Sequence, residues 1–325
     1  MRVLITGGSG FIGTNLIDHL SAPGMEILNL DIAPPRNKLH AAHWRQIDLC
    51  DRGALTSCIR EFQPELLFHL GARTDLDGAG VADYAANTIG VSNLIDAALA
   101  TPSIARVVFA STRLVCRIGY QPAHDEDYCP TTAYGESKVE GECVVRRRCA
   151  SAPFSWVILR PTSIWGPWFD VPYKLFFLSV AKGRYIHPRG VHINKSFGFV
   201  GNTVHQLALV GRAPADRLNG STMYLADYPP IEVSQLANEI QKASHAAPVR
   251  SVPLLLLRAI ASAGDAAKAL GMRNPPLTSF RLNNLLAPMV HDLDPLERLC
   301  GPLPHGLSDG VLQTVTWLRA QGQIS

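Results

Sequence analysis

The sequence predicts an α/β fold of the Rossmann type: a doubly wound parallel sheet, completed by a smaller and discontinuous C-terminal lobe. The first half of the chain alternates short apolar runs with helical patterns, as a parallel sheet requires. The first run, residues 2–6, leads directly into a glycine-spaced turn and a helix. Beyond Pro161 the pattern is less regular. We expect one domain at 1–161 plus about 200–228, and a second lobe at 162–199 and 229–325.

The turn after the first apolar run has the spacing of a dinucleotide site. Gly7 permits a tight turn, Gly10 lets the backbone approach a pyrophosphate, and Gly13 lets the helix pack closely on the strand. Phe11 and Ile12 begin that helix, whose free N–H groups and positive dipole end favour phosphate. A glycine turn without flanking strand and helix would be weak evidence; here both are present.

An acidic residue predicts which dinucleotide binds. The second expected strand, residues 26–30, ends at Asp31. An acid about 20 residues beyond the glycines accepts hydrogen bonds from the adenosine ribose hydroxyls. Its charge also repels a 2′-phosphate, so NAD is favoured over NADP, although Arg36 weakens this preference.

Other strand ends should meet the same crevice, because ligands in such sheets bind outside the carboxyl ends of the strands. An expected third strand leads into Asp48 and Leu49, and a fourth, residues 66–70, closes at Gly71. The expected cofactor contacts from the glycine turn and the strand ends are Gly7, Gly10, Phe11, Ile12, Gly13, Asp31, Asp48, Leu49, Leu70, Gly71 and Ala72.

Tyr134 and Lys138 stand four residues apart, on one face of an expected helix. A phenol with its ordinary pKa of about 10 is a poor base at neutral pH, but the nearby ammonium, with an oxidised nicotinamide, should lower this pKa. Tyr134 could then take a proton from a carbinol while Thr112 hydrogen-bonds the reacting oxygen. The two residues could also belong to an ordinary amphipathic helix without a catalytic role. Their position after Thr112, behind a dinucleotide signature, favours the catalytic interpretation. Thr112, Tyr134 and Lys138 are therefore the candidate catalytic residues.

In its segments 6–13, 109–112 and 134–138, the chain resembles the extended short-chain dehydrogenase/reductase family, in its nucleotide-sugar epimerase, dehydratase and reductase branch. The resemblance covers nearly the whole length. It implies that Thr112 orients the substrate oxygen, that Tyr134 is the acid/base, and that Lys138 binds the nicotinamide ribose. Asn87 matches the family's asparagine beside the active site, which adds Asn87, Tyr134 and Lys138 to the expected cofactor contacts.

The chain departs from this family at positions that decide the reaction. Sugar 4,6-dehydratases of the family follow the active-site threonine with an Asp-Glu pair that performs the elimination; here Arg113 and Leu114 follow it. Ser163 replaces a substrate-contacting asparagine, Lys195 replaces an arginine, and Arg281 resembles the late arginine that binds a substrate diphosphate. By this resemblance the substrate contacts are Thr112, Ser163, Lys195 and Arg281.

Three functions are consistent with these residues. A nucleotide-sugar 4-epimerase, which keeps NAD bound and returns hydride to the other face of the sugar, is the favoured interpretation. A reductase of an NDP-4-keto-6-deoxy sugar would use the same catalytic residues. A cofactor-binding regulator without turnover is the least favoured, because Tyr134 and Lys138 are both present.

The bulk composition limits the partners. Of 325 residues, 47% are hydrophobic and 18% charged, which is typical of globular proteins. A net charge of +3 does not indicate a nucleic-acid partner, and seven cysteines without a C-x-x-C pair do not indicate a metal site. The most apolar run, residues 252–260, is too short to cross a membrane. No leader precedes the first strand, so we expect a cytoplasmic protein, and the resemblance allows a homodimer.

Overall fold

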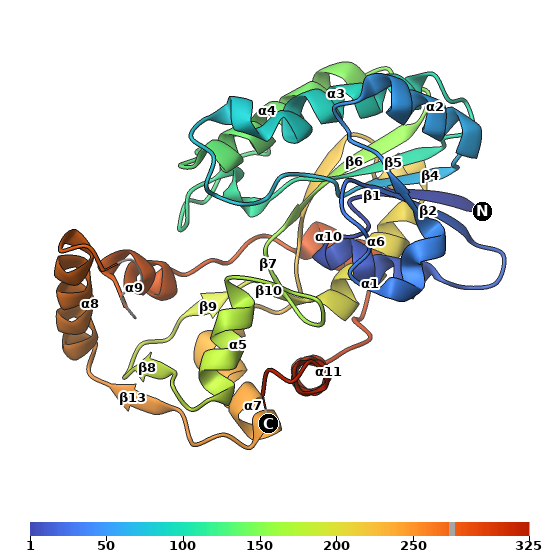
Figure 1. The fold of residues 1–325 in the computed structure, drawn as a ribbon. Coiled ribbons are helices and arrows are strands. Elements are labelled where there is room, and N and C mark those ends of the chain that lie inside the picture. The colour runs from blue at the N-terminus through green and yellow to red at the C-terminus, as the bar shows by residue number, and fades with distance from the viewer. Residues whose placement is uncertain (273–276, 325) are drawn as a thin grey trace.

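The computed structural model describes residues 1–272 and 277–324, with the backbone alone at Phe280 and Arg281. Its centre is a parallel sheet of seven strands in the order β11-β6-β5-β4-β1-β2-β3, which confirms the predicted fold class (Figure 1). The strand order reverses between β1 and β4, and the crevice at such a reversal is where ligands of these sheets bind. The strands are β1 (Arg2–Thr6), β2 (Glu26–Asp31), β3 (Trp44–Gln46), β4 (Leu66–His69), β5 (Arg106–Ala110), β6 (Ser155–Pro161) and β11 (Ser221–Leu225).

Helices cover both faces of this sheet, as Figure 1 shows. One layer is formed by α2 (Arg52–Phe62), α3 (Ala85–Leu99) and α4 (Ala133–Cys149), and the other by α1 (Phe11–Leu20) and α6 (Val200–Arg212), with α10 (Asp294–Cys300) against α6. Successive residues of a strand pack against opposite helix layers. Leu67 and Val107 pack against the layer of α2, α3 and α4, and Phe68 and Val108 pack against the layer of α1 and α6. Burial on both faces explains why these strands are continuous apolar runs in the sequence.

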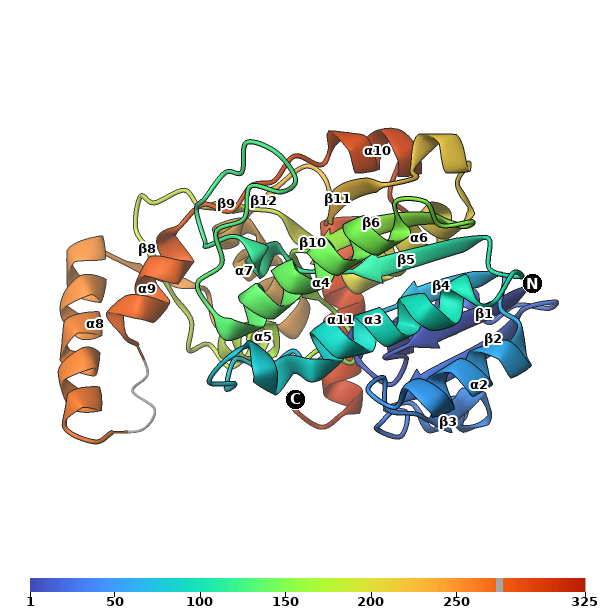
Figure 2. The ribbon, with the colours of Figure 1, turned by 90° about the horizontal axis from the view of Figure 1, so that it is seen from above.

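The second lobe is built from short strands and helices around the far end of the sheet. Its strands pair two by two: β7 with β10, β9 with β12, and β8 with β13. Helix α11 packs on α7, whereas α8 and α9 stand at the opposite end of the molecule from the N-terminus (Figure 2). The elements are β7 (Ser163–Trp165), α5 (Tyr173–Ala181), β8 (Ile186–Pro188), β9 (Asn194–Lys195), β10 (Phe197–Phe199), β12 (Ile231–Glu232), α7 (Val233–Ser244), β13 (Arg250–Val252), α8 (Leu254–Ala269), α9 (Ser279–Leu286) and α11 (Leu307–Ala320).

The turn that begins the second lobe is tied to the first domain by two hydrogen bonds. Asn15 Nδ2, in α1, donates to the carbonyl oxygen of Pro167 at 3.0 Å. Arg36 Nη1, in the loop after β2, donates to the carbonyl oxygen of Trp168 at 2.8 Å. Short 3₁₀ helices complete the connections at η1 (Lys38–His43), η2 (Val81–Tyr84), η3 (Arg113–Val115) and η4 (Ala215–Arg217). Among the described residues, no helix is long and apolar enough to span a membrane.

Candidate active site

The glycine turn between β1 and α1 leaves no room for side chains. Gly7 has a φ of +72°, and a Cβ there would lie 2.5 Å from the backbone nitrogen of Gly71. A Cβ on Gly13 would lie 2.3 Å from the carbonyl oxygen of Gly7. Helix α1 begins at Phe11 with Gly10 as its N-cap, and no side chain caps it. Since its first turn stays open, this helix end fits the pyrophosphate of a dinucleotide.

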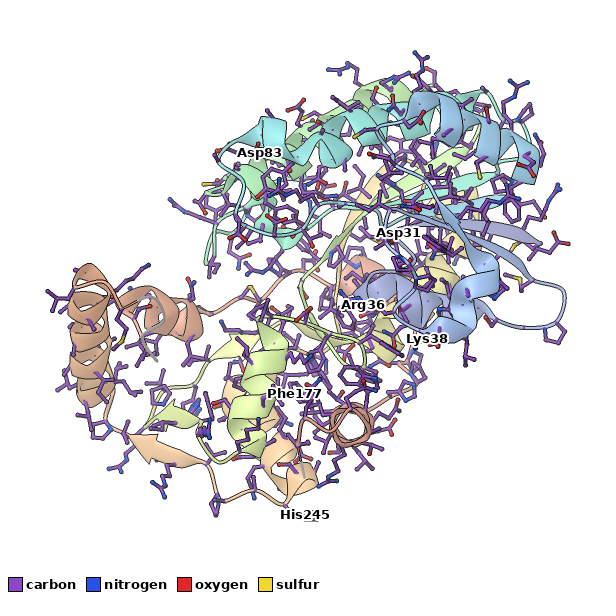
Figure 3. All side chains as sticks on the ribbon, viewed as in Figure 1. Asp31, Arg36, Lys38, Asp83, Phe177 and His245 are labelled. Carbon is purple, nitrogen blue, oxygen red and sulfur yellow. The ribbon has the colours of Figure 1, made fainter. Side chains whose placement is uncertain are left out.

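Asp31 lies at the end of β2, next to the glycine turn. Its Oδ2 accepts a hydrogen bond from the backbone nitrogen of Ser9 at 3.1 Å, and its Oδ1 accepts one from that of Ala33 at 3.0 Å. Burial raises the pKa of this carboxyl, while these backbone donors and Arg36 act in the opposite direction. Figure 3 labels Asp31 and Arg36 on the side of the sheet that faces the second lobe. Because the guanidinium of Arg36 is bonded to Trp168, the acid is the group that is placed to meet a ribose.

The end of β4 closes the crevice beside the glycine turn. The backbone nitrogen of Gly71 donates to Thr6 Oγ1 at 3.2 Å, and that of Leu70 donates to the carbonyl oxygen of Thr6 at 3.0 Å. The side chain of Leu49 packs so closely that a Cβ on Gly71 would lie 2.9 Å from its Cδ1. The structure therefore brings Leu49, Leu70 and Gly71 to the glycine turn, with Ala72 next in the chain. The carboxylate of Asp48 instead accepts a hydrogen bond from its neighbour, the backbone nitrogen of Cys50, at 2.8 Å.

Thr112 and Tyr134 meet at the carboxyl end of β5. Thr112 caps η3, where its Oγ1 accepts a hydrogen bond from the backbone nitrogen of Leu114 at 3.2 Å. Tyr134 lies in the first turn of α4, which Thr132 caps through a 3.0 Å bond to the backbone nitrogen of Gly135. Burial raises the pKa of Tyr134 to about 12, and the Thr112 hydroxyl acts in the opposite direction. A hydroxyl and a phenol are thus placed side by side, as transfer of a proton to or from a carbinol requires.

Lys138 is buried and is bonded to the end of β5. Its Nζ donates to the carbonyl oxygen of Ala110 at 2.7 Å, and burial lowers its pKa to about 8 against the opposing charge of Glu142. The groups that shift the pKa of Tyr134 are Thr112 and Tyr84, not Lys138. The prediction that this ammonium lowers the pKa of the phenol includes an oxidised nicotinamide, and it stays a prediction for the enzyme with its cofactor. In the protein alone, burial has the largest effect on the phenol and raises its pKa.

Glu142 and Arg160 form an ion pair behind Lys138 that the sequence analysis missed. Arg160 Nη2 lies 2.7 Å from Glu142 Oε2, and both side chains are 1% exposed. Tyr128 donates a further hydrogen bond to Glu142 Oε2 at 3.0 Å. A signal was present: Lys138 and Glu142 are opposite charges four residues apart on one helix, and Arg160 ends a strand at the predicted crevice.

Asn87 connects α3 to the catalytic helix. Its Oδ1 accepts a hydrogen bond from the backbone nitrogen of Arg73 at 2.9 Å, and its Nδ2 donates to Ser137 Oγ at 2.9 Å. Ser137 in turn donates to the carbonyl oxygen of Tyr134 at 2.7 Å. Asn87 therefore holds the helix turn that carries Tyr134, whatever contact it makes with a cofactor.

Apart from Thr112, the predicted substrate residues follow β6 in the chain and belong to the second lobe. Ser163 is fully buried, and its Oγ accepts a hydrogen bond from Tyr173. Lys195 is buried too, and its Nζ donates to the carbonyl oxygen of Asn284 at 2.7 Å. This bond links β9 to α9, the helix that also contains Arg281. The Arg281 side chain itself lies outside the described residues.

Comparisons with known proteins show which proteins the chain is similar to. The NAD dependent epimerase/dehydratase family matches residues 3–182. A 3β-hydroxysteroid dehydrogenase/Δ5→4-isomerase of Mycobacterium tuberculosis is 27% identical over 74% of this chain and 69% of its own. A 2-alkyl-3-oxoalkanoate reductase of Stenotrophomonas maltophilia is 26% identical over 94% of this chain and 95% of its own. The solved UDP-glucose 4-epimerase of Thermotoga maritima, with UDP-glucose, shares the fold with a TM-score of 0.74 at 17% identity, over 99% of both chains.

Proposed function

Because the chain belongs to the NAD dependent epimerase/dehydratase family, we propose that it is a nucleotide-sugar 4-epimerase. It is an enzyme of the short-chain dehydrogenase/reductase superfamily, and its cofactor is NAD. The open turn at Gly10 and the acid at Asp31 are suited to the pyrophosphate and ribose of this cofactor. The likeness in fold to an epimerase solved with UDP-glucose supports a nucleotide sugar as substrate.

NAD supplies reversible hydride transfer when it is bound along the glycine turn. The residues of the chain handle the oxygen and its proton. As the phenolate, which the positive charge of an oxidised nicotinamide would favour, Tyr134 would take the proton of the sugar hydroxyl as its carbon is oxidised. It would give the proton back when the carbon is reduced from the other face. The hydroxyl of Thr112 hydrogen-bonds the same oxygen. Lys138, held by Ala110 two residues before Thr112, binds the nicotinamide ribose in this proposal.

The absence of elimination chemistry next to Thr112 carries the choice of reaction. Arg113 and Leu114 follow Thr112, where an acid and a base would be needed to remove water from the sugar. In the described part of the chain, the groups that shift the pKa of Tyr134 are a hydroxyl and a second phenol, and no carboxylate is among them. Oxidation and reduction of one carbinol is the chemistry that these residues support.

The test is a product analysis with purified enzyme and defined nucleotide sugars. UDP-glucose, UDP-galactose, UDP-N-acetylglucosamine and UDP-glucuronate are each incubated with the enzyme, and the sugar proton couplings are followed by NMR. We expect inversion at C4 in at least one of them, without net accumulation of NADH. Tyr134→Phe serves as the inactive control. Net consumption of NADH with a 4-keto sugar, and no inversion in any substrate, would reject the epimerase.

A reductase of an NDP-4-keto-6-deoxy sugar is the second candidate. It is favoured by the two relatives above, whose names are those of a dehydrogenase and a reductase. Both activities require Thr112 and Tyr134, so these residues do not separate them. Retention of the cofactor separates the two activities. An epimerase ends each turnover with oxidised NAD still bound, whereas a reductase must exchange its oxidised cofactor for a reduced one. Mass spectrometry of the nucleotide that co-purifies with the enzyme distinguishes the two.

We further propose that Lys195 and Arg281 bind the substrate diphosphate from the second lobe. Lys195 reaches α9, the helix of Arg281, through its bond to Asn284. Loss of a charge-assisted bond to phosphate should weaken binding by about 1.5–3 kcal/mol. Calorimetric titration of Lys195→Met and Arg281→Met with UDP tests this, and unchanged affinity in both would remove these residues from the diphosphate site.

The remaining expectations concern the state of the protein in the cell. We propose that it works as a homodimer in the cytoplasm. Sedimentation of the purified protein tests the first point, and fractionation of the native cells tests the second.

A further inference from the structure

Arg113 is a half-buried cation that has no counter-ion among the residues that the structure describes. It follows Thr112 directly, in η3, and it is only partly accessible to solvent. Among the residues that the structure describes, its guanidinium makes no hydrogen bond and no ion pair. Comparable arginines are satisfied: Arg160 pairs with Glu142, and Arg106 donates to Ser155 and to the carbonyl oxygen of Val210. A guanidinium offers five donors and cannot lose its charge, so its burial is costly unless a ligand supplies acceptors.

Further basic groups gather around Arg113. Lys195 is buried, and both burial and the charge of Arg113 lower its pKa, to about 8. His291 lines the same small pocket as Arg113, and neither ring nitrogen of His291 has a hydrogen-bond partner in the described part of the chain. Lys195 pairs with Met289, and the backbone nitrogen of His291 donates to Ser196 Oγ at 3.0 Å. The segment after α9 therefore brings these basic groups together.

The described groups that face this cluster are neutral or cationic. Burial lowers the pKa of Arg113, and the side chains that oppose this shift are Tyr173 and Tyr224. Tyr224 stacks on the ring of His291 with 4.0 Å between centroids, and Tyr173 donates to Ser163. The pKa of His291 is lowered by burial, by Arg113 and by Arg160. No carboxylate of the described chain is among the groups acting on Arg113, Lys195 or His291.

We infer that Arg113 and Lys195 form an anion-binding subsite beside Thr112, which takes a carboxylate or a phosphate of the substrate. The planar fork of arginine suits both groups, and lysine adds a point charge. The inference rests on the proposed function for the identity of the sugar, but it assigns Arg113 a role that the family resemblance does not. Since Arg113 adjoins Thr112, a carboxylate held there would belong to the sugar, whereas a phosphate would belong to the nucleotide.

Three ligands distinguish a carboxylate of the sugar from a phosphate of the nucleotide. UDP-glucose and UDP-glucuronate differ in one carboxylate, and UDP has no sugar. Each is titrated calorimetrically into wild-type enzyme, Arg113→Met and Lys195→Met. The matched control is Arg60→Met, because Arg60 is an exposed arginine on α2 that does not line the pocket of Arg113 and His291.

If the subsite binds a sugar carboxylate, wild type should bind UDP-glucuronate about 10- to 100-fold more tightly than UDP-glucose, and Arg113→Met should remove this preference. If the subsite binds a phosphate of the nucleotide, Arg113→Met should weaken the binding of all three ligands by a similar factor. Both results support the subsite. Wild-type affinity for all three ligands in Arg113→Met would overturn it, even if the enzyme is a proven epimerase.

The subsite can also be tested if the proposed function fails. Should wild type bind none of the three nucleotides, the nucleotide-sugar proposal is wrong, and inorganic diphosphate becomes the probe. The subsite then predicts that diphosphate raises the melting temperature of wild type and Arg60→Met but not of Arg113→Met. Equal shifts in all three proteins would overturn it. The melting temperatures without ligand show whether each variant is folded, and Arg113→Lys, which keeps the charge, should recover part of the shift.

Discussion

Glu142 Oε1 and Oε2 accept hydrogen bonds from Arg160 Nε and Nη2, at 2.9 and 2.7 Å, one helix turn beyond Lys138. The pair joins the catalytic helix α4 to strand β6 in the interior. The Glu142 charge partly offsets the effect of burial on Lys138, whose pKa nevertheless falls to about 8. The ion pair therefore acts on the stability of the fold and on the charge of Lys138, a candidate catalytic residue.

Glu142→Gln should strongly destabilise the protein. Breaking a buried ion pair leaves one charge unpaired, at a typical loss of about 3–5 kcal/mol in the free energy of unfolding. Urea unfolding measures this loss. Glu140→Gln, an exposed position on the same helix, is the control and should change stability little. A small effect of Glu142→Gln would mean that water or Tyr128 compensates Arg160.

Tyr134→Phe should reduce turnover by roughly 10²–10⁴ while ligand binding survives, because the ring stays and the transferable proton goes. Steady-state kinetics and titration with NAD measure the two effects. Tyr228→Phe, which removes a phenol bonded to the carbonyl oxygen of Gly301, is the control and should keep its activity. Full activity in Tyr134→Phe would exclude this residue as the acid/base.

Asp31→Ala should weaken NAD binding and reduce the preference over NADP, since both the ribose acceptor and the repulsive charge are removed. The bonds from Ser9 and Ala33 to this carboxylate are lost as well, so the glycine turn should become less ordered. Calorimetry with both dinucleotides is the measurement. Wild-type protein that prefers NADPH would contradict the assignment of Asp31.

His69→Phe should make stability less sensitive to acid. Burial lowers the pKa of His69 from 6.5 to about 3, with a smaller contribution from Lys138. Between these values the unfolded chain binds a proton that the folded chain does not. Stability is therefore fully present above pH 6.5 and is lost as the pH falls towards 3, by up to about 1.4 kcal/mol per pH unit.

Urea unfolding at several pH values between 7 and 4 measures this slope for wild type and His69→Phe. Replacement of the exposed His245, labelled in Figure 3, by Gln is the control and should leave the slope unchanged. The same slope in wild type and His69→Phe would show that His69 is not the group that resists protonation.

The sequence predicted those parts of the site that depend on local spacing. The turn from Gly7 to Gly13 and the acid at Asp31 lie where a strand, a turn and a helix must place them. The sheet was equally predictable, because strands buried on both faces leave continuous apolar runs in the chain.

Features that depend on packing between distant segments could not be predicted. Lys138 and an oxidised nicotinamide were expected to lower the pKa of Tyr134, but in the protein alone burial, which no local pattern reveals, raises it. The contact between Lys195 and Asn284 joins residues 89 positions apart in the sequence. In the sequence, Arg113 was notable only because it stands where the dehydratases of the family carry an acid. That it has no counter-ion among the described residues became visible only in the structure, where the second lobe supplies its neighbours.

The bonds from Asn15 and Arg36 to the turn at Pro167 and Trp168 imply reciprocity between the two ligands of the enzyme. In the proposed function, Asn15 belongs to the helix that would meet the pyrophosphate, and Arg36 belongs to the loop after the acid that would meet the ribose. The two acceptors, Pro167 and Trp168, begin the lobe that would meet the sugar. If the dinucleotide fixes this turn, it raises the affinity for the sugar, and thermodynamic linkage requires the sugar to raise the affinity for the dinucleotide by the same factor. An enzyme that retains its cofactor between turnovers would thus be helped to do so by its own substrate.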